Sequence, residues 1–220
     1  MGVTMKILKS REDWLENRTS TIGGSDASAI IGVNPWTTNQ KLWQIKTGQA
    51  EADDDISDLR VVKFGIDAEP LMREMFKLDY PEYKVFYEEN NIWFNSDYPF
   101  AHASLDGWLE DAAGRKGIFE NKTVNIMNAT ATEKWKNAIP DYYYTQLLHY
   151  FLVTGFDFAI LKARLRWEKH DDAEVYCQIR HYRVEREEVL DDIQFLAEKE
   201  KEFDQQIKER RQPALILPDI

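Results

Sequence analysis

Three polar side chains in the middle of the chain have types and spacing that suit chemistry. Glu120 and Lys122 are separated by one residue in a predicted strand, so both project from the same face while Asn121 points away. Asp106 lies in the preceding predicted strand, and a polar, glycine-bearing turn joins the two strands. The pattern therefore predicts that Asp106, Glu120 and Lys122 converge.

Hydrolysis of a phosphodiester requires these residue types. Carboxylates are hard oxygen ligands that suit Mg²⁺, and two of them can hold one or two ions that polarise the phosphate and acidify a water molecule. The ammonium group of Lys122 adds a positive charge near the attacking water or the charge that develops on the phosphate. We therefore expect Mg²⁺ as the cofactor, with Mn²⁺ as a substitute, and Glu69 as a further carboxylate beside a helix break.

A purely structural interpretation of the same residues competes with this one. Acid–x–lysine patterns arise by chance in many sequences, and most Glu-x-Lys pairs in strands face solvent. The surroundings favour a site, because Asp106 and Glu120 stand among apolar strand residues, namely Leu105, Trp108, Ile118 and Phe119. A carboxylate in such a position is costly unless it is paired or binds a metal ion.

The periodicity of apolar residues and the turn residues predict the elements that must position these side chains. Helices are expected from Ser10, from Ser25 (as N-cap) to Gly32, and at residues 39–46, 59–78, 129–137, 141–154 and 186–210. Strands are expected at residues 84–90, 91–95, 101–111, 117–124, 157–167 and 174–184. Pro70 either kinks the 59–78 helix or marks the start of a new helix at Glu69.

The order of these elements is helices, an antiparallel meander of strands, a helix, two further strands and a final helix. This order predicts an α/β or α+β fold in which helices flank a mixed central sheet. A length of 220 residues suits a single domain. Within it we expect an N-terminal helical part at about 1–58, a core at about 59–184 and the C-terminal helix at about 186–210.

The distribution of charge leaves a nucleic-acid substrate open. The net charge of −11 argues weakly against one, and residues 51–58 alone carry five acids in what is expected to be a solvated loop. Between Ala112 and Lys169, however, nine Lys or Arg residues outnumber five acids. A locally basic surface can bind a phosphate backbone, since total charge affects solubility and approach more than the chemistry of a site.

Cysteine usage and hydropathy bear on the compartment. Cys177 is the only cysteine, which excludes an internal disulfide bond and a cysteine-based zinc site. A single thiol is typical of a reducing compartment, so we expect the cytoplasm. No run approaches 18 apolar residues and the first residues lack the apolar segment of a signal peptide, so neither membrane insertion nor secretion is expected.

Several segments, in this order, resemble a known family. They are Arg18 followed by TIGGSDASAIIGVNPW and KLWQIKTG, then FGIDAEPLMREMF, AHASLDGWLED, FENKT and YYYTQLLHYFLVTG. Between about Ser10 and Val184 the chain is similar to the YqaJ-like viral recombinases, which are phage-type exonucleases related to lambda exonuclease in the PD-(D/E)XK nuclease superfamily. The resemblance implies a restriction-endonuclease-like core.

The resemblance implies roles for the acidic residues and the lysine. Asp106 and Glu120 match the metal ligands, Lys122 matches the catalytic lysine, and Glu69 matches an acid carried by a helix. The proline that gives the superfamily its name is replaced here by Leu105. Many relatives also lack that proline, so the departure does not change the expected metal site.

The resemblance also implies residues that bind the substrate. Positions that hold the 5′-phosphate end in the family match Arg18 and Ser25, and further polar positions of the active site match Ser104 and Gln146. A second glutamine, expected two residues after Gln146, is Leu148 in this sequence. The role of the glutamine-bearing helix is therefore less defined than that of the acids.

Each of these residues also has an ordinary structural interpretation. Arg18 would be a surface arginine, Ser25 a helix cap and Gln146 a satisfied core amide. His149 is expected to be structural rather than a ligand. Tyr142–Tyr144 are expected in the core and on the helix surface, with base stacking as the alternative.

Together, the residues and the resemblance predict an exonuclease that degrades one strand of double-stranded DNA from a 5′ end. The product is a 3′ overhang for a single-strand annealing protein. The expected partners are DNA ends, that annealing protein and further copies of the chain in a ring-shaped homotrimer, in the cytoplasm of a bacterial host. Two alternatives remain: an endonuclease of the same superfamily, and a DNA-binding relative that does not cut. The complete acid–acid–lysine set argues against the second.

Overall fold

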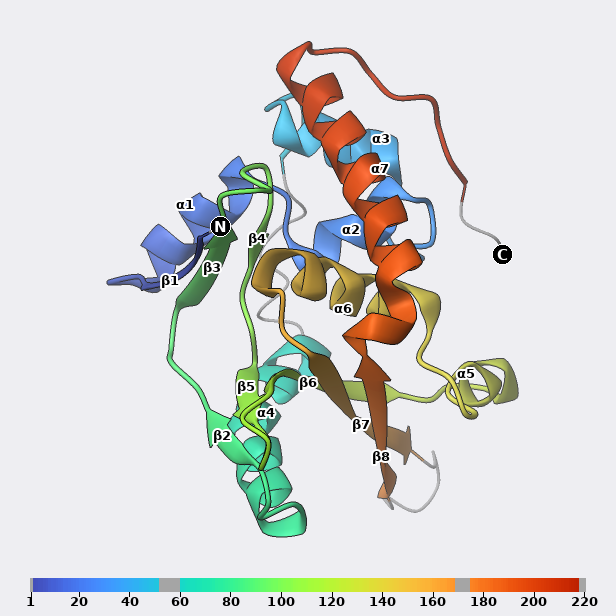
Figure 1. Ribbon diagram of the computed structural model, residues 1–220. Coiled ribbons are helices and arrows are strands. Elements are labelled where there is room, and N and C mark those ends of the chain that lie inside the picture. Colours follow the sequence, from blue (N-terminus) through green and yellow to red (C-terminus); the bar gives the residue numbers. More distant parts are fainter. Residues whose placement is uncertain (1, 52–59, 169–174, 218–220) are drawn as a thin grey trace.

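The computed structural model describes residues 2–51, 60–168 and 175–217, which form helices packed around a central sheet (Figure 1). The helices are α1 (Arg11–Ser20), α2 (Gly24–Ile30), α3 (Asn39–Lys46), α4 (Arg60–Asp79), α5 (Ala129–Lys134), α6 (Asp141–Thr154) and α7 (Leu190–Lys208). The strands are β1 (Val3–Ile7), β2 (Lys84–Phe86), β3 (Asn91–Asn95), β4 (His102–Ala103), β5 (Gly107–Glu110), β6 (Lys116–Asn125), β7 (Phe158–Glu168) and β8 (Val175–Glu185). Residues 52–58, which make up most of the predicted acidic loop, lie outside the described residues.

The centre of the molecule is a five-stranded sheet in the order β2-β5-β6-β7-β8, and a three-stranded sheet in the order β1-β3-β4 accompanies it. In the larger sheet β6 and β7 are parallel, whereas the other neighbours are antiparallel. A parallel pair requires a crossover connection, and the segment that contains α5 and α6 provides it. The predicted architecture, with helices flanking a mixed central sheet, is confirmed.

Strand β1 was not predicted. Val3, Met5 and Ile7 alternate with polar residues, which is the pattern that could have revealed it. The strand is exposed along its whole length and pairs with β3 at the edge of the smaller sheet. Its side chains therefore contribute little to the core.

The predicted antiparallel meander is wrong in two places. The expected neighbours at 84–90 and 91–95 do not pair with each other, because β2 joins the larger sheet and β3 joins the smaller one. The chain changes sheets at Asn90, which adopts a left-handed conformation with φ 54°. The predicted strand 101–111 is likewise divided into β4 and β5, and residues 104–106 carry the chain back to the larger sheet.

One side chain replaces strand pairing at this second crossing. The amide of Asn91 donates to the backbone oxygen of Leu105 at 2.9 Å and accepts from the backbone nitrogen of Leu105 at 3.0 Å. Asn91 is buried, and its oxygen also accepts from Trp93 Nε1 at 3.1 Å. The amide therefore fixes the segment that immediately precedes Asp106.

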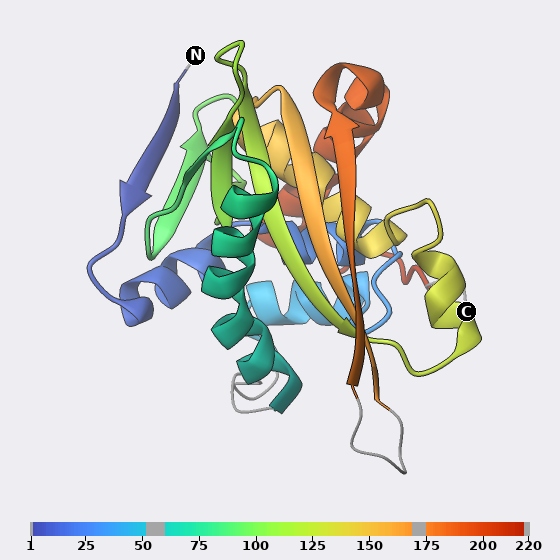
Figure 2. The same cartoon turned by 90° about the horizontal axis from the view of Figure 1, so that it is seen from below.

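Helices cover both faces of the larger sheet, with α4 on one side and α6 on the other (Figure 2). On the α4 side, the rings of Phe119 of β6 and Phe76 of α4 lie 4.6 Å apart. On the α6 side, Ile118 belongs to the same core cluster as Leu147 and Phe151. Because side chains alternate along a strand, Glu120 and Lys122 share the α6 side with Ile118.

Several helix ends differ from the prediction. Ser10 caps α1 as expected, and its hydroxyl accepts from Asp13 N. Ser25 is not the N-cap of α2: the cap is Gly23, whose backbone nitrogen donates to Asp26 Oδ2 at 3.0 Å, so the helix begins one residue before Ser25. Gly155 ends α6 in the left-handed conformation, as predicted.

The remaining boundaries shift by a few residues. Helix α4 is continuous from Arg60 to Asp79 with Pro70 inside it, so a new helix does not begin at Glu69. The predicted 129–137 helix is shorter and ends at Lys134. The predicted final helix divides into a 3₁₀ turn at Arg186–Val189 and α7.

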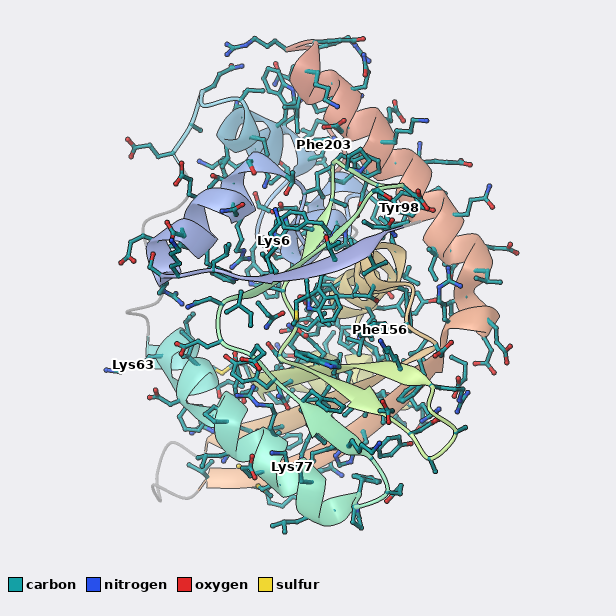
Figure 3. All side chains as sticks on the ribbon, turned by 60° about the vertical axis from the view of Figure 1, so that its left-hand side comes forward. Lys6, Lys63, Lys77, Tyr98, Phe156 and Phe203 are labelled. Atoms are coloured by element: carbon teal, nitrogen blue, oxygen red, sulfur yellow. The ribbon has the colours of Figure 1, made fainter. Side chains whose placement is uncertain are left out.

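The distribution of side chains follows these layers. Figure 3 shows Phe156 and Phe203 within the body of the molecule, and both are buried. Lys63 extends outward from α4 in the same view. Among the described residues, no helix has the length and apolar character needed to cross a membrane.

Candidate active site

The three residues singled out from the sequence come together in the middle of β6, next to the point where its pairing with β5 begins. Lys122 Nζ lies 2.6 Å from Glu120 Oε1, and the carboxylate of Asp106 accepts a hydrogen bond from Asn121 N at 2.8 Å. The predicted convergence is confirmed, but Asp106 is not within a strand. It is the last residue of the segment that links β4 to β5, at the point where the chain re-enters the larger sheet.

Burial disfavours the charged forms of the carboxyl groups of Asp106 and Glu120. Glu120 is 2% exposed. Burial, together with the negative charge of Asp106, raises its pKa to about 8, although Lys122 opposes the shift. Burial also raises the pKa of Asp106, against the influence of Lys122. The second oxygen of Glu120 is buried and has no hydrogen-bond partner within the described part of the chain. Such an arrangement of acids is one that an additional cation would stabilise.

Glu69 on α4 belongs to the same electrostatic group. Burial, and next the charge of Asp106, raise the pKa of Glu69 to about 8, while Arg73 and Lys122 act in the opposite direction. The continuous helix α4 therefore places this half-buried acid within reach of Asp106. The structure thus brings all four predicted catalytic residues into one interacting set.

Arg73, which was not predicted as a site residue, holds Asp106 in position. Its guanidinium donates to the backbone oxygen of Asp106 at 2.8 Å and lies 3.6 Å from the centre of the Tyr87 ring. Arg73 follows Glu69 by four residues, so both project from the same face of α4. That spacing is the signal that could have identified it.

Lys122 is held in its charged form. Although burial opposes the positive charge, the adjacent carboxylate of Glu120 outweighs that cost and raises the pKa of Lys122. The ammonium group also lies 4.8 Å from the centre of the Tyr143 ring, a distance suited to a cation–π contact. The lysine is therefore a fixed positive charge beside the two acids.

The oxygen donors of Asp106 and Glu120 determine which divalent cation the site suits. Among residues 2–51, 60–168 and 175–217, no three His, Cys, Asp or Glu side chains form a ready-made coordinating group. Mg²⁺ does not need one, because it usually binds through one or two carboxylates and keeps several water molecules. The unpaired oxygen of Glu120 and the raised pKa values of Asp106 and Glu120 therefore fit Mg²⁺, and the all-oxygen donors do not suit a structural zinc site.

A second polar cluster is formed by side chains of α1, α2 and the segment between β4 and β5. Arg18 Nη2 donates to Ser25 Oγ at 3.4 Å, and the guanidinium lies 4.3 Å from the ring centre of Trp14. Trp14 Nε1 in turn donates to Ser104 Oγ at 2.9 Å. Three residues predicted to bind the substrate, Arg18, Ser25 and Ser104, are thus joined through one indole. Trp14 was not predicted as a site residue, although it precedes Arg18 by four residues on the same helix.

The segment between β4 and β5 connects this second cluster to the acids. Ser104 stands two residues before Asp106 in the segment between β4 and β5. Arg18 and Ser25 lie in α1 and in the first turn of α2. The guanidinium and two hydroxyl groups of this cluster are therefore connected to Asp106 along the chain through Ser104, and such groups suit a phosphate group.

Gln146 joins the two clusters from α6. Its Nε2 donates to Tyr150 OH at 2.6 Å. Both side chains press against Gly24, where an added Cβ would lie 2.6 Å from Tyr150 and 3.0 Å from Gln146, so only glycine fits. Burial, followed by the charge of Glu120, raises the pKa of Tyr150. Tyr150 was missed, although it follows Gln146 at helical spacing.

His149 is separate from the acids. It is fully buried between α6 and α7, where Nδ1 lies 2.7 Å from Glu200 Oε1 and Nε2 lies 2.7 Å from the backbone oxygen of His102. Burial opposes its charge, but Glu200 outweighs that effect and raises the pKa of His149. Leu148, at the position of the expected second glutamine, is buried in the core. The histidine therefore has a structural role, as the sequence indicated.

Comparison with known proteins adds to this geometry. Residues 13–157 match the model of the YqaJ-like viral recombinase domain. The chain is also 34% identical, over 147 residues, to the protein named "Uncharacterized protein YqaJ" of Bacillus subtilis (strain 168). That alignment covers 66% of this chain and 43% of the relative, so less than half of the relative's length is matched.

Solved structures share the fold. An alkaline exonuclease (LHK-Exo) from Laribacter hongkongensis aligns with a TM-score of 0.60 at 16% identity, covering 91% of this chain and 96% of that one. A phage related exonuclease from Haemophilus somnus 129PT aligns with a TM-score of 0.56 at 15% identity, covering 86% of this chain and 96% of that one. At these identities the likeness supports the fold alone. The predicted site residues, from Arg18 to Gln146, all fall within the family match.

Proposed function

The chain belongs to the YqaJ-like viral recombinase domain family, and on that basis we propose that it is a magnesium-dependent exonuclease acting on double-stranded DNA. The observation that carries the proposal is the convergence of Asp106, Glu120 and Lys122, with Ser104 of the Arg18 cluster two residues before Asp106. The relatives' names agree with this chemistry, since LHK-Exo is an alkaline exonuclease and has also been solved in complex with dAMP.

In this proposal the carboxylates of Asp106 and Glu120 hold Mg²⁺. When bound, the ion polarises the scissile phosphate and acidifies a water molecule. Lys122 stabilises the negative charge that develops on the phosphate, because Glu120 and the ring of Tyr143 fix its ammonium group in place. Glu69 supplies a further carboxylate next to Asp106, and Arg73 holds the backbone that carries Asp106.

The end of the DNA binds in the second cluster. A terminal 5′-phosphate carries more negative charge than an internal phosphodiester, so a dedicated guanidinium favours it. Arg18 provides two or more N–H groups in one plane, Ser25 and Ser104 provide hydroxyl groups, and Trp14 holds the arrangement together. Gln146 packs against Gly24, next to Ser25, and bonds to Tyr150, whose pKa is raised in part by the charge of Glu120.

The direction and the product follow from where the end is held. An enzyme that holds the 5′ end beside its carboxylates removes nucleotides in the 5′-to-3′ direction and leaves a 3′ overhang. Such an overhang is a substrate for a single-strand annealing protein, which we propose as the partner in recombination. We further propose that the protein acts in the cytoplasm and that a ring-shaped homotrimer encloses the DNA.

Digestion of defined DNA substrates in Mg²⁺ tests the proposal. Wild-type protein is expected to degrade linear duplexes with a 5′-phosphate rapidly, linear duplexes with a 5′-hydroxyl slowly, and covalently closed circular DNA not at all. EDTA should stop the reaction. Equal cleavage of linear and circular DNA would instead indicate an endonuclease of the same superfamily, and binding without cleavage would indicate a non-catalytic relative.

A further inference from the structure

Trp36 is unusual among the tryptophans of this chain. It exposes 71% of its surface, whereas the other six tryptophans are buried or half-buried. An exposed indole is a large apolar surface left in water, and it is more often found at binding surfaces than elsewhere. The position of Trp36 in the loop between α2 and α3 therefore calls for a functional explanation.

The loop holds Trp36 in a fixed position. The side-chain oxygen of Asn34 accepts from the backbone nitrogens of Trp36, at 2.8 Å, and Thr37, at 3.0 Å. The amide nitrogen of Asn34 donates to Ser28 Oγ of α2 at 2.9 Å, and Asn34 is itself buried. The indole is thus presented by a turn that is already ordered, which reduces the entropic cost of binding a ligand.

A row of aromatic contacts connects Trp36 to the catalytic lysine. The ring of Trp36 meets the ring of Tyr142 edge to face at 5.0 Å, and Tyr142 lies 4.4 Å from Tyr143. Tyr143 is the ring over which Lys122 Nζ lies, at 4.8 Å. The loop between α2 and α3 runs beside the first turn of α6, which carries both tyrosines (Figure 1). The exposed indole and the proposed reaction centre are therefore two ends of one row of side-chain contacts.

We propose that Trp36 and Tyr142 form a stacking surface for an unpaired nucleobase at the end of the DNA. This inference rests on the proposed nuclease function. Inside a duplex both faces of a base are covered by its neighbours, so an aromatic side chain can stack only on a terminal or unpaired base. A row with a cation at one end and the exposed ring of Trp36 at the other matches the alternation of phosphate and base along a single strand. Stacking tolerates any sequence, because every base has a π-face.

A fluorescent base analogue tests this directly. A duplex with a short unpaired end that carries 2-aminopurine is titrated with protein in EDTA, so that the DNA stays intact. Wild type and Trp36→Phe, which keeps an aromatic ring, are expected to quench the fluorescence. Trp36→Leu, which is apolar but cannot stack, should lose most of the quenching and bind about tenfold more weakly. Tyr176→Ala on β8, where the side chain is 62% exposed, is the matched control and should behave as wild type.

The outcomes separate this inference from the function on which it rests. Circular dichroism shows whether Trp36→Leu is folded, which is expected because the side chain is exposed. Unchanged quenching and affinity in Trp36→Leu overturn the stacking surface while leaving a DNA-degrading wild type in place. A change in oligomeric state without a change in quenching also overturns it, because the indole would then contact another copy of the chain. A wild type that fails to degrade linear DNA in Mg²⁺ contradicts the proposed function itself.

Discussion

The indole of Trp14 donates a hydrogen bond of 2.9 Å to Ser104, 90 residues further along the chain. This single contact ties α1 to the segment that carries Asp106. Trp14→Phe keeps the aromatic ring and removes the N–H group, so it should cost about 1 kcal/mol of stability, the value of one ordinary hydrogen bond. It should also reduce the preference for 5′-phosphorylated ends. Denaturant unfolding together with digestion rates on the two kinds of end measures both effects, and an unaltered preference would show that the hydrogen bond does not position the end-binding cluster.

Arg18 is expected to determine the response to the 5′ end. Arg18→Ala should slow digestion of 5′-phosphorylated ends by raising the activation free energy by roughly 1.5–3 kcal/mol, the range for a hydrogen bond to a charged group. It should affect 5′-hydroxyl ends much less. Lys6→Ala is the control, because Lys6 is a cation on the exposed strand β1. Equal losses on both substrates would make Arg18 an ordinary surface arginine.

The metal site predicts a loss of activity without a loss of fold. Asp106→Asn and Glu120→Gln should each reduce cleavage in Mg²⁺ by about a hundredfold or more, the effect of removing one group that stabilises charge in the transition state. Isothermal titration with Mg²⁺ should show weaker binding, and circular dichroism should be unchanged. Glu133→Gln, an exposed acid on α5, serves as the control and should cleave normally. Near-normal cleavage by either site variant would remove that residue from the metal site.

Lys122 is expected to act on the rate rather than on binding. Lys122→Ala should lower the rate at saturating DNA by about a hundredfold while the Kd for DNA changes little, because the ammonium group interacts with charge that develops only in the transition state. Lys136→Ala, an exposed lysine two residues after the end of α5, is the comparison. A variant that binds DNA poorly but cleaves normally at saturation would assign Lys122 to substrate binding instead.

Glu69 gives a prediction about pH. Its pKa is raised from 4.5 to about 8, so the folded protein holds the proton more tightly than the unfolded chain does. Without metal, the stability contributed by protonated Glu69 is therefore complete below about pH 4.5 and is lost as the pH rises towards 8. Glu69→Gln should make this dependence shallower, while the raised pKa values of Glu120 and Asp106 leave part of it in place. Melting temperatures in EDTA at pH 5.5 and pH 8.5 measure it, and an equally steep dependence in the variant would contradict the assignment.

Local patterns in the sequence predicted the acids and the lysine of the candidate site but not the residues that position them. Glu120 and Lys122 share a face because strand residues alternate, and this follows from spacing alone. Arg73 bonds to Asp106, Trp14 bonds to Ser104 and Tyr150 packs against Gly24, all of them distant in the sequence, so these roles depend on packing that spacing does not reveal. Their helical spacing from predicted residues was nevertheless present in the sequence.

The errors in strand pairing have the same origin. A turn signal at Asn90 correctly marks a break between strands, but it does not specify which strand each segment will join. That choice depends on Asn91, whose amide bonds to Leu105 in place of a neighbouring strand. The N-cap of α2 was misplaced for a similar reason, because the side chain of Asp26 favours Gly23 as the cap over Ser25.

The parallel pairing of β6 with β7 has a consequence for synthesis of the protein. Strand β6 ends at Asn125, whereas β7 does not begin until Phe158. The ribosome must therefore synthesise the whole crossover segment before β7 is available to pair with β6. Pairings between segments so far apart form late, because a long loop must close first. A nascent chain that already contains Asp106 and Glu120 therefore still lacks the sheet that aligns them until translation has passed β7.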